Sequence, residues 1–502
     1  MNIESDAGIN ISKTLLKRTA IIFCLLMISC GLGLFAPALI PESITEFTAI
    51  AIILVLIIGG FLYLSLDLSL IAITRFLFIF SFFFKADITL FKIDEIEDPS
   101  GLNISLTLVT ALFLIGYDLI DSNRQCDVRV QTKLFSILVL AIFIWTIISV
   151  IYAGSSPLGW FSIWSFLTLI IVTYSIASHF SNRERLIEIV SALAFGLLFT
   201  GLVSISQYFA DFPTNLAAFG TGTEEELFGT QSQLLSRVPA FMRTPTEMAW
   251  VVASLIPIIT AILVCRVKDF NGWQKFLVLA SVILGIAAII LSLARGSWIS
   301  LVVGLLMLFS LGWYRLSSPE RKNYFISLVG VAVLGCLVLL PLSGRIYDRL
   351  NGEDEGSALI RIPLMETAIR MIKDNPIVGV GMNGYRSSMT KYDETDIFVS
   401  QVFPNPVHNI FAHITGEIGI PGGILFCLLI FAALFECWKA MTIHDRLLFA
   451  IGLGVMVGII GFVISAIKEP GSLGSTRPPM RTLFLMFGII LAISRIRRQN
   501  II

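Results

Sequence analysis

The side chains best suited to chemistry lie in the second half of the chain. The longest polar stretch runs from Ser357 to Ile424 and contains two of the four histidines, His408 and His413. His408 follows the sequence PNPV and precedes a predicted helix. An imidazole has an unperturbed pKa near 6.5, which suits proton transfer. Asn409, His413 and Glu417 follow at intervals of four, so they share one helix face. This face is either a substrate-binding surface or a structural polar network.

Arginines precede two of the predicted apolar segments, those near 246–265 and 296–315. Arg295, in LSLARGSW, lies between two apolar runs, where a charge is costly unless it reaches water or a partner. Its guanidinium either snorkels to lipid headgroups or grips a phosphate through two parallel hydrogen bonds. Gly296 beside it leaves room for close approach. Arg237 and Arg243, in SRVPAFMRTPTEMAW, are candidates for the same cavity.

The other polar groups are weaker candidates for a functional site. His179 and His444 fall at loops predicted to be cytoplasmic and are interpreted as bystanders. The acidic runs at 353–355 and 393–396 lack regular metal-ligand spacing, so solvated loops are expected there. GVGMNGY is not a dinucleotide fingerprint, since no soluble strand–helix unit surrounds it. We therefore predict neither a metal site nor a cofactor.

Composition indicates a membrane protein. Of 502 residues, 56% are hydrophobic and only 14% are charged, and the mean hydropathy is +0.88. That balance is typical of a polytopic all-α protein. The 35 basic and 35 acidic residues cancel, so charge indicates no nucleic-acid partner. The seven cysteines fall mostly inside apolar runs and imply no disulfide framework.

About fourteen spans are expected (range 12–14), because each needs roughly 20 apolar residues. They are placed near 19–40, 46–66, 68–84, 102–121, 133–153, 158–180, 186–209, 246–265, 273–294, 296–315, 324–341, 409–437, 446–467 and 481–494. Lys and Arg gather in alternate loops, so both termini are predicted to be cytoplasmic.

Residues 1–502 read as a single transmembrane domain with one large outer loop at 342–408. Inside that loop, Ser357 can cap a helix ending near Lys373. Leu359, Ile362, Met365, Ile369 and Ile372 recur at helical spacing and predict one apolar stripe. We therefore expect a helix lying along the membrane surface. Asn375-Pro376 should end it, and the glycines after it permit a tight path.

Three blocks resemble the O-antigen ligase and polymerase (Wzy-type) membrane glycosyltransferases. They are AFMRTPTEMAW, SLARGSWISL, and NPIVGVGMNGY followed by His408-Asn409, nine residues and GIPG. The blocks span about 240–425 and occur in the order of that superfamily. The first half of the chain adds hydropathy alone to the resemblance.

The resemblance implies a metal-independent inverting transfer at the periplasmic face of a bacterial inner membrane. The donor would be an undecaprenyl-diphosphate-linked saccharide, and the acceptor a lipid-linked chain or lipid A-core. Membrane lipids and a chain-length regulator are the other partners that it implies. Arg243 and Arg295 would stabilise the leaving diphosphate, and His408 would act as the general base. Arg361 and Arg386 would guide the diphosphate or the sugar.

Three functions remain open from the sequence. A repeat-unit polymerase is favoured over a ligase because the predicted span count exceeds the usual dozen of the ligases. A lipid-linked oligosaccharide flippase is the alternative of another class. Transporters of that kind tend to carry an internal repeat, whereas the polar residues here gather in one late loop.

Overall fold

A computed structural model describes residues 69–84, 87–91, 101–120, 133–154, 157–209, 237–316, 318–340, 343, 344, 347, 357–475 and 477–499. Two compact units are distinguished, Met1–Arg75 and Phe76–Ile502. Of the first unit only residues 69–75 are described, so the account below concerns the second. The predicted spans near 19–40 and 46–66 lie outside the described residues.

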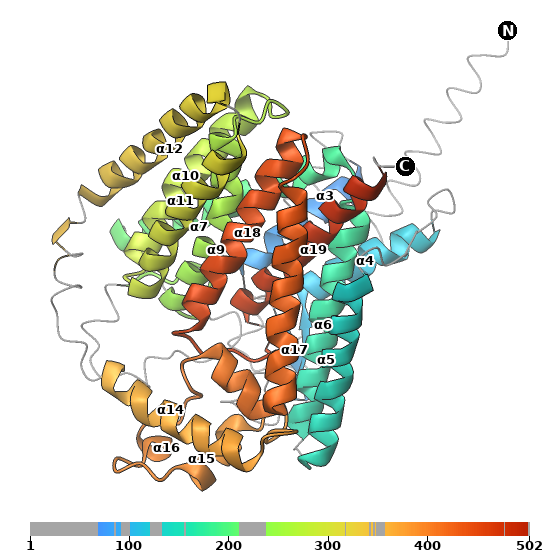
Figure 1. The fold of residues 1–502 in the computed structure, drawn as a ribbon, viewed down its shortest axis with the longest axis vertical. Helices are drawn as coiled ribbons and strands as arrows, with labels where there is room; N and C mark the ends of the chain where they lie inside the picture. Colours follow the sequence, from blue (N-terminus) through green and yellow to red (C-terminus); the bar gives the residue numbers. More distant parts are fainter. Residues whose placement is uncertain are drawn as a thin grey trace, which may run out of the picture. The chain divides into compact units, whose positions relative to one another are not determined.

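The described chain is mostly helical, as composition predicts (Figure 1). Its elements are α3 (Leu70–Phe80), η1 (Ser81–Phe83), β1 (Asp87–Leu90), β2 (Leu102–Ser105), α4 (Leu106–Ile120), α5 (Lys133–Tyr152), α6 (Pro157–His179), α7 (Arg183–Phe209), α9 (Pro245–Val264), α10 (Gly272–Leu291), α11 (Arg295–Arg315), α12 (Ser318–Leu339), α14 (Ser357–Asp374), α15 (Tyr385–Tyr392), α16 (Val399–Val402), α17 (Ile410–Ala440), α18 (Arg446–Ala466) and α19 (Pro478–Gln499).

Among the described residues, nine helices are long and apolar enough to cross a membrane. They are α5, α6, α7, α9, α10, α11, α17, α18 and α19. The spans predicted near 68–84 and 102–121 correspond to shorter apolar helices, and α12 covers the span predicted near 324–341. The total of fourteen therefore stays a prediction, whereas the multi-pass helical character is observed.

An antiparallel hairpin departs from the all-helical expectation. β1 pairs with β2, with Asp87 opposite Ser105, so residues 102–105 are a strand and not the start of a span. The side chain of Asp87 is buried and forms an ion pair with Arg481 of α19. A buried carboxylate and guanidinium compensate each other's desolvation. The pair therefore anchors the hairpin to α19.

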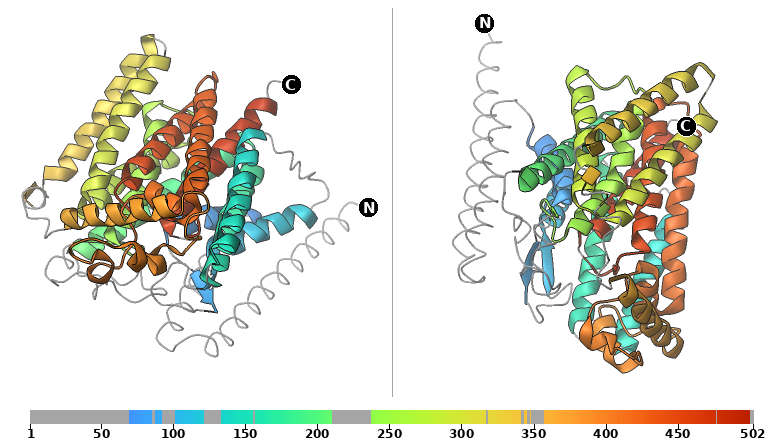
Figure 2. Two further views of the ribbon diagram at one scale, coloured as in Figure 1. Left: turned by 60° about the horizontal axis from the view of Figure 1, so that its bottom comes forward. Right: turned by 90° about the vertical axis from the view of Figure 1, so that its left-hand side faces the viewer.

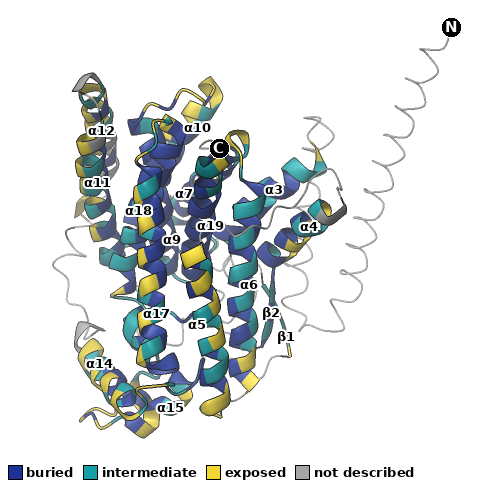
Figure 3. Cartoon of the chain, turned by 45° about the vertical axis from the view of Figure 1, so that its right-hand side comes forward, coloured by how far each residue is buried: buried dark blue, intermediate teal, exposed yellow. Residues whose placement is uncertain are grey.

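The core of the bundle is the contact between α9 and α18. Every residue of α9 from Glu247 to Ile262 is buried, which is typical of a helix that is apolar all round (Figure 3). Gly454 and Gly458 of α18 let the two backbones approach closely. A Cβ at Gly454 would lie 2.4 Å from Cα of Ile258, and one at Gly458 would lie 2.3 Å from the Ser254 carbonyl oxygen.

Residues 357–407, called the cap below, lie between α12 and α17 and cross one end of the bundle (Figures 1 and 2). The helix predicted from Ser357 is present as α14, and it ends before Asn375-Pro376 as expected. Two residues of the predicted stripe lie outside the protein core. Ile362 and Ile369 are exposed, whereas Leu364, Ala368 and Met371 are buried. The reason is that α15 and α16 cover this second face, with Tyr385, Met389, Tyr392 and Val399 packed against it.

A break in α17 receives the loop after α14. Ile418 and Gly419 have non-helical dihedral angles, and Gly419 has a φ of 74°. The carbonyls released by the break accept hydrogen bonds from elsewhere. Two backbone N–H groups of the loop donate to them, that of Val380 to the Gly416 carbonyl (3.0 Å) and that of Gly381 to the Glu417 carbonyl (2.9 Å). Two side chains of α5 also donate, the Ser149 hydroxyl to the Glu417 carbonyl (3.1 Å) and the Trp145 indole N–H to the Ile418 carbonyl (2.8 Å). The carbonyl groups at the break therefore all have hydrogen-bond partners, and these bonds attach the cap to α17 and α5.

We expect Gly419→Ala to destabilise the protein strongly. A Cβ at Gly419 would lie 1.9 Å from the Ile377 carbonyl oxygen, and the positive φ alone costs a side chain on the order of 1–3 kcal/mol. Thermal unfolding of the purified protein measures the loss. Gly330→Ala on α12 is the matched control, since a Cβ there meets nothing within 4 Å. Equal melting temperatures for both variants would contradict this account of the break.

Candidate active site

Several helices begin at the end of the bundle that carries the cap. Among them are α9 after Thr244, α11 after Ala294, α17 after Asn409, and α19 at Pro478 (Figure 1). Thr244 and Asn409 are N-caps whose side chains accept backbone N–H groups of the first turn. Helix N-termini carry partial positive charge. This end of the bundle is therefore suited to an anion.

Arg237 and Arg477 reinforce that positive charge. Arg237 donates from Nε to the Ser292 carbonyl at 2.9 Å and from Nη2 to Thr246 Oγ1 at 3.3 Å, which joins the end of α10 to the start of α9. Arg477 Nη1 lies 3.7 Å from Oε1 of the buried Glu247. The predicted Arg237 thus lies at this end of the bundle, together with Arg477, which sequence reasoning missed.

The loop between α18 and α19, called the 467–477 loop below and described at residues 467–475 and 477, passes between the helix starts. The Lys468 side chain comes within 3.7 Å of where a Gly296 Cβ would lie, and Gly471 packs against Ile410. Glu469 therefore lies between the starts of α11 and α17. Burial raises the pKa of the Glu469 carboxyl to about 7, although the positive charges of Arg361 and Arg237 oppose the shift. The polar, glycine-rich sequence KEPGSLGSTR was the available signal for this residue.

His408 lies immediately before α17, as predicted. Its ring is 5.8 Å from that of Phe403, and within the described residues its Nδ1 is buried without a hydrogen-bond partner. Burial, with smaller contributions from the positive charge of Arg361 and from the neighbouring His413, lowers the pKa of His408 to about 4. The imidazole is therefore neutral near pH 7 and can accept a proton.

His413 and Glu417 do share one face of α17, with His413 Nε2 3.5 Å from Glu417 Oε1. The Glu417 carboxylate also accepts the Asn383 backbone N–H at 2.8 Å and the Ser472 hydroxyl. These contacts join α17 to the cap and to the 467–477 loop. Glu417 thus has a positioning role, and Asn409 caps α17. A direct contact of either with substrate stays a prediction.

The remaining predicted residues are distributed around this centre. Arg295 is the first residue of α11, half-exposed and next to Gly296, which faces Lys468. Arg243 is half-buried in the turn before Thr244. Arg361 is exposed on the first turns of α14 and acts electrostatically on both His408 and Glu469. Arg386 lies on α15, in the cap. The tertiary structure thus gathers Arg237, Arg361, His408 and His413 with Glu469.

Acidic groups of the cap have structural partners. The Asp393 carboxylate accepts hydrogen bonds from the Thr395 N–H and hydroxyl and from the Ser400 N–H. It therefore holds the turn that precedes α16. Across the described part of the chain, no three His, Cys, Asp or Glu side chains are grouped so as to hold a metal ion.

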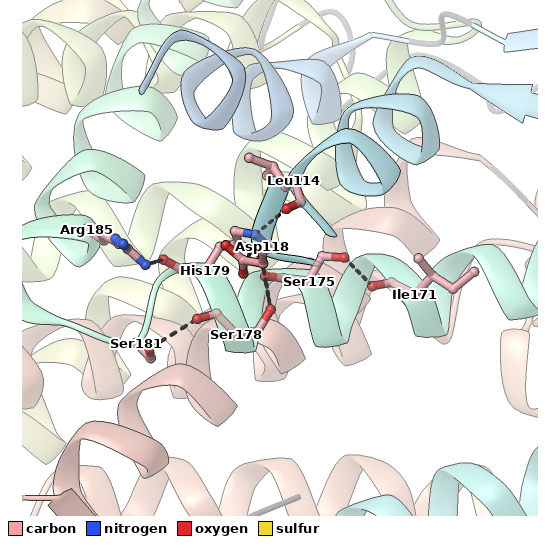
Figure 4. A network of polar contacts seen from close by, with 8 residues as sticks. All are labelled: Leu114, Asp118, Ile171, Ser175, Ser178, His179, Ser181 and Arg185. Carbon is pink, nitrogen blue, oxygen red and sulfur yellow. Dashed lines mark hydrogen bonds and ion pairs between the residues drawn. The ribbon is translucent and has the colours of Figure 1, made fainter. Parts of the chain in front are cut away.

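The opposite end of the bundle also carries charged side chains, but they are paired there. Arg183 contacts Asp269 and Asp445, and Arg446 contacts Glu320, around a depression of about 420 Å³. His179 is buried with Nε2 2.9 Å from Asp118 and Nδ1 3.0 Å from the Ser175 carbonyl (Figure 4). This network joins α4 to α6. His179 is thus a packing residue, which agrees with its interpretation as a bystander.

Comparison with known proteins singles out the same region. Residues 279–427 match the family model described as O-antigen ligase. The match begins in α10 and ends in α17, so it includes Arg295, the cap and His408. Arg237, Arg243 and the 467–477 loop lie outside it. No curated protein matches the chain.

Proposed function

We infer from the match of residues 279–427 to the O-antigen ligase family model that the chain belongs to the O-antigen ligase/polymerase family, and from that premise we propose a specific reaction. The protein transfers a glycan from an undecaprenyl-diphosphate donor to an acceptor hydroxyl, with inversion and without a metal ion. The acceptor is a lipid-linked chain or lipid A-core. The reaction takes place at the cap end of the bundle.

One observation carries this proposal, namely the position of a neutral imidazole beside a group of arginines. His408 and Arg361 are electrostatic neighbours, and Arg361 also acts on Glu469 together with Arg237 and Arg477. A glycosyl diphosphate needs positive charge for its leaving group and a base for the acceptor. Both kinds of group occur here within one set of loops.

The chemical step uses these groups as follows. The acceptor O–H bond breaks and its proton passes to His408, while the oxygen bonds the anomeric carbon from the face opposite the diphosphate. The bond between that carbon and the diphosphate oxygen breaks, and the electron pair leaves with the diphosphate. Arg243 and Arg295, with Arg237 and Arg361, stabilise the charge that develops there. The lipid tail lies among the spans.

The charge distribution supports a periplasmic site in the bacterial inner membrane. The helix ends and loops opposite the cap carry clustered basic residues, namely Arg183, Arg185, Arg266, Lys268, Arg321, Lys322, Lys439, Arg446, Arg495, Arg497 and Arg498. Cytoplasmic loops of membrane proteins are enriched in Lys and Arg. We therefore propose that the cap end is periplasmic; the predicted even number of spans then places both termini in the cytoplasm.

Purified protein tests the reaction directly. Incubated with an undecaprenyl-diphosphate-linked saccharide and an acceptor in detergent, it should lengthen or transfer the glycan in the presence of a chelator. No membrane gradient is needed. Movement of donor across vesicles without any glycan transfer would instead indicate a flippase and overturn the proposal.

We propose polymerase activity because the predicted span count exceeds the usual dozen of the ligases; the description of the matching family favours ligase activity. A deletion strain separates the two. Single-repeat lipopolysaccharide is the result expected of a lost polymerase. Rough lipopolysaccharide with long lipid-linked polymer retained would identify a ligase.

A further inference from the structure

Glu469 is a carboxyl where the proposed chemistry needs positive charge. It lies in the 467–477 loop, between Lys468, which packs over Gly296 at the start of α11, and Gly471, which packs against Ile410 at the start of α17. Its side chain is half-buried. A carboxylate in such a place would repel a diphosphate, so its presence calls for a physical explanation.

Charged groups face Glu469 from several elements. Arg361 of α14, Arg237 before α9 and Arg477 of its own loop attract its negative charge, and Glu247 of α9 repels it. Lys468 precedes it in the chain, and Arg295 begins the helix over which Lys468 packs. His408, on which Arg361 also acts electrostatically, is neutral near pH 7. Cationic neighbours therefore outnumber the anionic one.

Two of these neighbours, Arg237 and Arg361, are also groups that the proposed reaction places against the diphosphate, and Arg477 acts on the same carboxyl. When a diphosphate binds there, its negative charge competes with the Glu469 carboxylate for these arginines. The carboxylate then has a like charge beside it, which favours its protonated form. Because the carboxyl of Glu469 already titrates near neutral pH, with a pKa of about 7, this proton uptake requires little free energy.

We propose that Glu469 competes with the lipid diphosphate for these arginines, and that it takes up a proton when the diphosphate binds. The inference rests on the proposed lipid-diphosphate donor. In the absence of donor the ionised carboxylate neutralises the arginines. After glycan transfer Glu469 loses its proton again, and its restored charge helps to expel the undecaprenyl diphosphate. Glu469 is thus a positioning residue that sets donor affinity and product release.

Glu469→Gln should bind undecaprenyl diphosphate more tightly than the wild type does. Glutamine keeps the size but carries no charge, so the competition is lost. With one proton taken up, wild-type binding of undecaprenyl diphosphate should be weaker than that of the variant by roughly tenfold at pH 8, and the two should converge at pH 6. Dividing the two Kd values removes the titration of the ligand itself. In transfer assays the variant should show a lower KM for donor and a lower kcat.

Two further measurements sharpen the test. Glu469→Asp should retain the pH dependence, and Glu394→Gln, an exposed carboxylate in the cap, should behave as wild type. Calorimetry of the wild type at pH 8, in two buffers of different ionisation enthalpy, should show uptake of about one proton. That result does not depend on the folding of any variant.

The outcomes separate the two proposals. Binding of undecaprenyl diphosphate without proton uptake, or a Glu469→Gln variant that binds more weakly at every pH, overturns the role of Glu469 alone. A wild-type protein that fails to bind undecaprenyl diphosphate at pH 6 and transfers no glycan overturns the proposed donor, and the present inference with it.

Discussion

Replacing His408 with alanine should lower glycan transfer by about 10²–10⁴-fold, the range that general acid–base catalysis contributes. The burial of His408 and the positive charge of Arg361 hold its pKa at about 4. The wild-type imidazole is therefore an unprotonated acceptor at neutral pH. The variant loses that acceptor while Arg237 and Glu469 remain in place. Initial rates with saturating donor and acceptor measure the effect.

The low pKa of His408 also sets the direction of the pH dependence. Since the group is protonated only below a pH of about 4, the contribution of His408 should persist as pH falls from 7 to 5 and disappear as pH falls through about 4. His444→Ala is the matched control, because that histidine is exposed at the opposite end of the bundle. A His408→Ala protein that produces glycan at the normal rate would refute the assignment of His408 as the base.

Arg295→Ala is expected to lower kcat/KM by about 10²–10³-fold, the effect of removing one preorganised donor to a developing negative charge. Arg295 begins α11, where the helix N-terminus adds partial positive charge to its own. Arg295→Lys should restore only part of the rate, because an ammonium cannot make the two parallel hydrogen bonds of a guanidinium. Transfer assays on the purified variants supply the comparison.

The control for charge removal is Arg266→Ala, at an exposed arginine of the opposite end whose Nε contacts Ser327 Oγ. This variant should transfer glycan as the wild type does. If Arg295→Ala and Arg266→Ala had the same small effect, the loss would reflect overall charge and not a contact with the diphosphate. A full restoration by Arg295→Lys would likewise argue against bidentate recognition.

Much of the protein was predictable from its sequence because the signals are local. Apolar runs of span length predict α5 to α7, α9 to α11 and α17 to α19, since lipid requires each segment to satisfy its own backbone hydrogen bonds. Ser357 and Asn375-Pro376 mark the ends of α14, and His408 precedes α17 as expected. These features depend on neighbours a few residues away.

Tertiary structure decided what covers each face and which distant loops meet. The buried face of α14 became Leu364, Ala368 and Met371 because α15 and α16 fold against it, and periodicity alone could not choose between two apolar faces. The hairpin at Asp87 depends on a charge nearly four hundred positions away, Arg481.

The site itself shows the same division. The sequence alone determined a membrane domain, an imidazole at a helix start and arginines before two spans. Only the fold decided that Glu417 anchors the cap and that Glu469 lies among Arg237, Arg361 and Arg477. Those four residues come from three segments of the chain. Their charges interact because packing brings the segments together, and no local pattern encodes that distance.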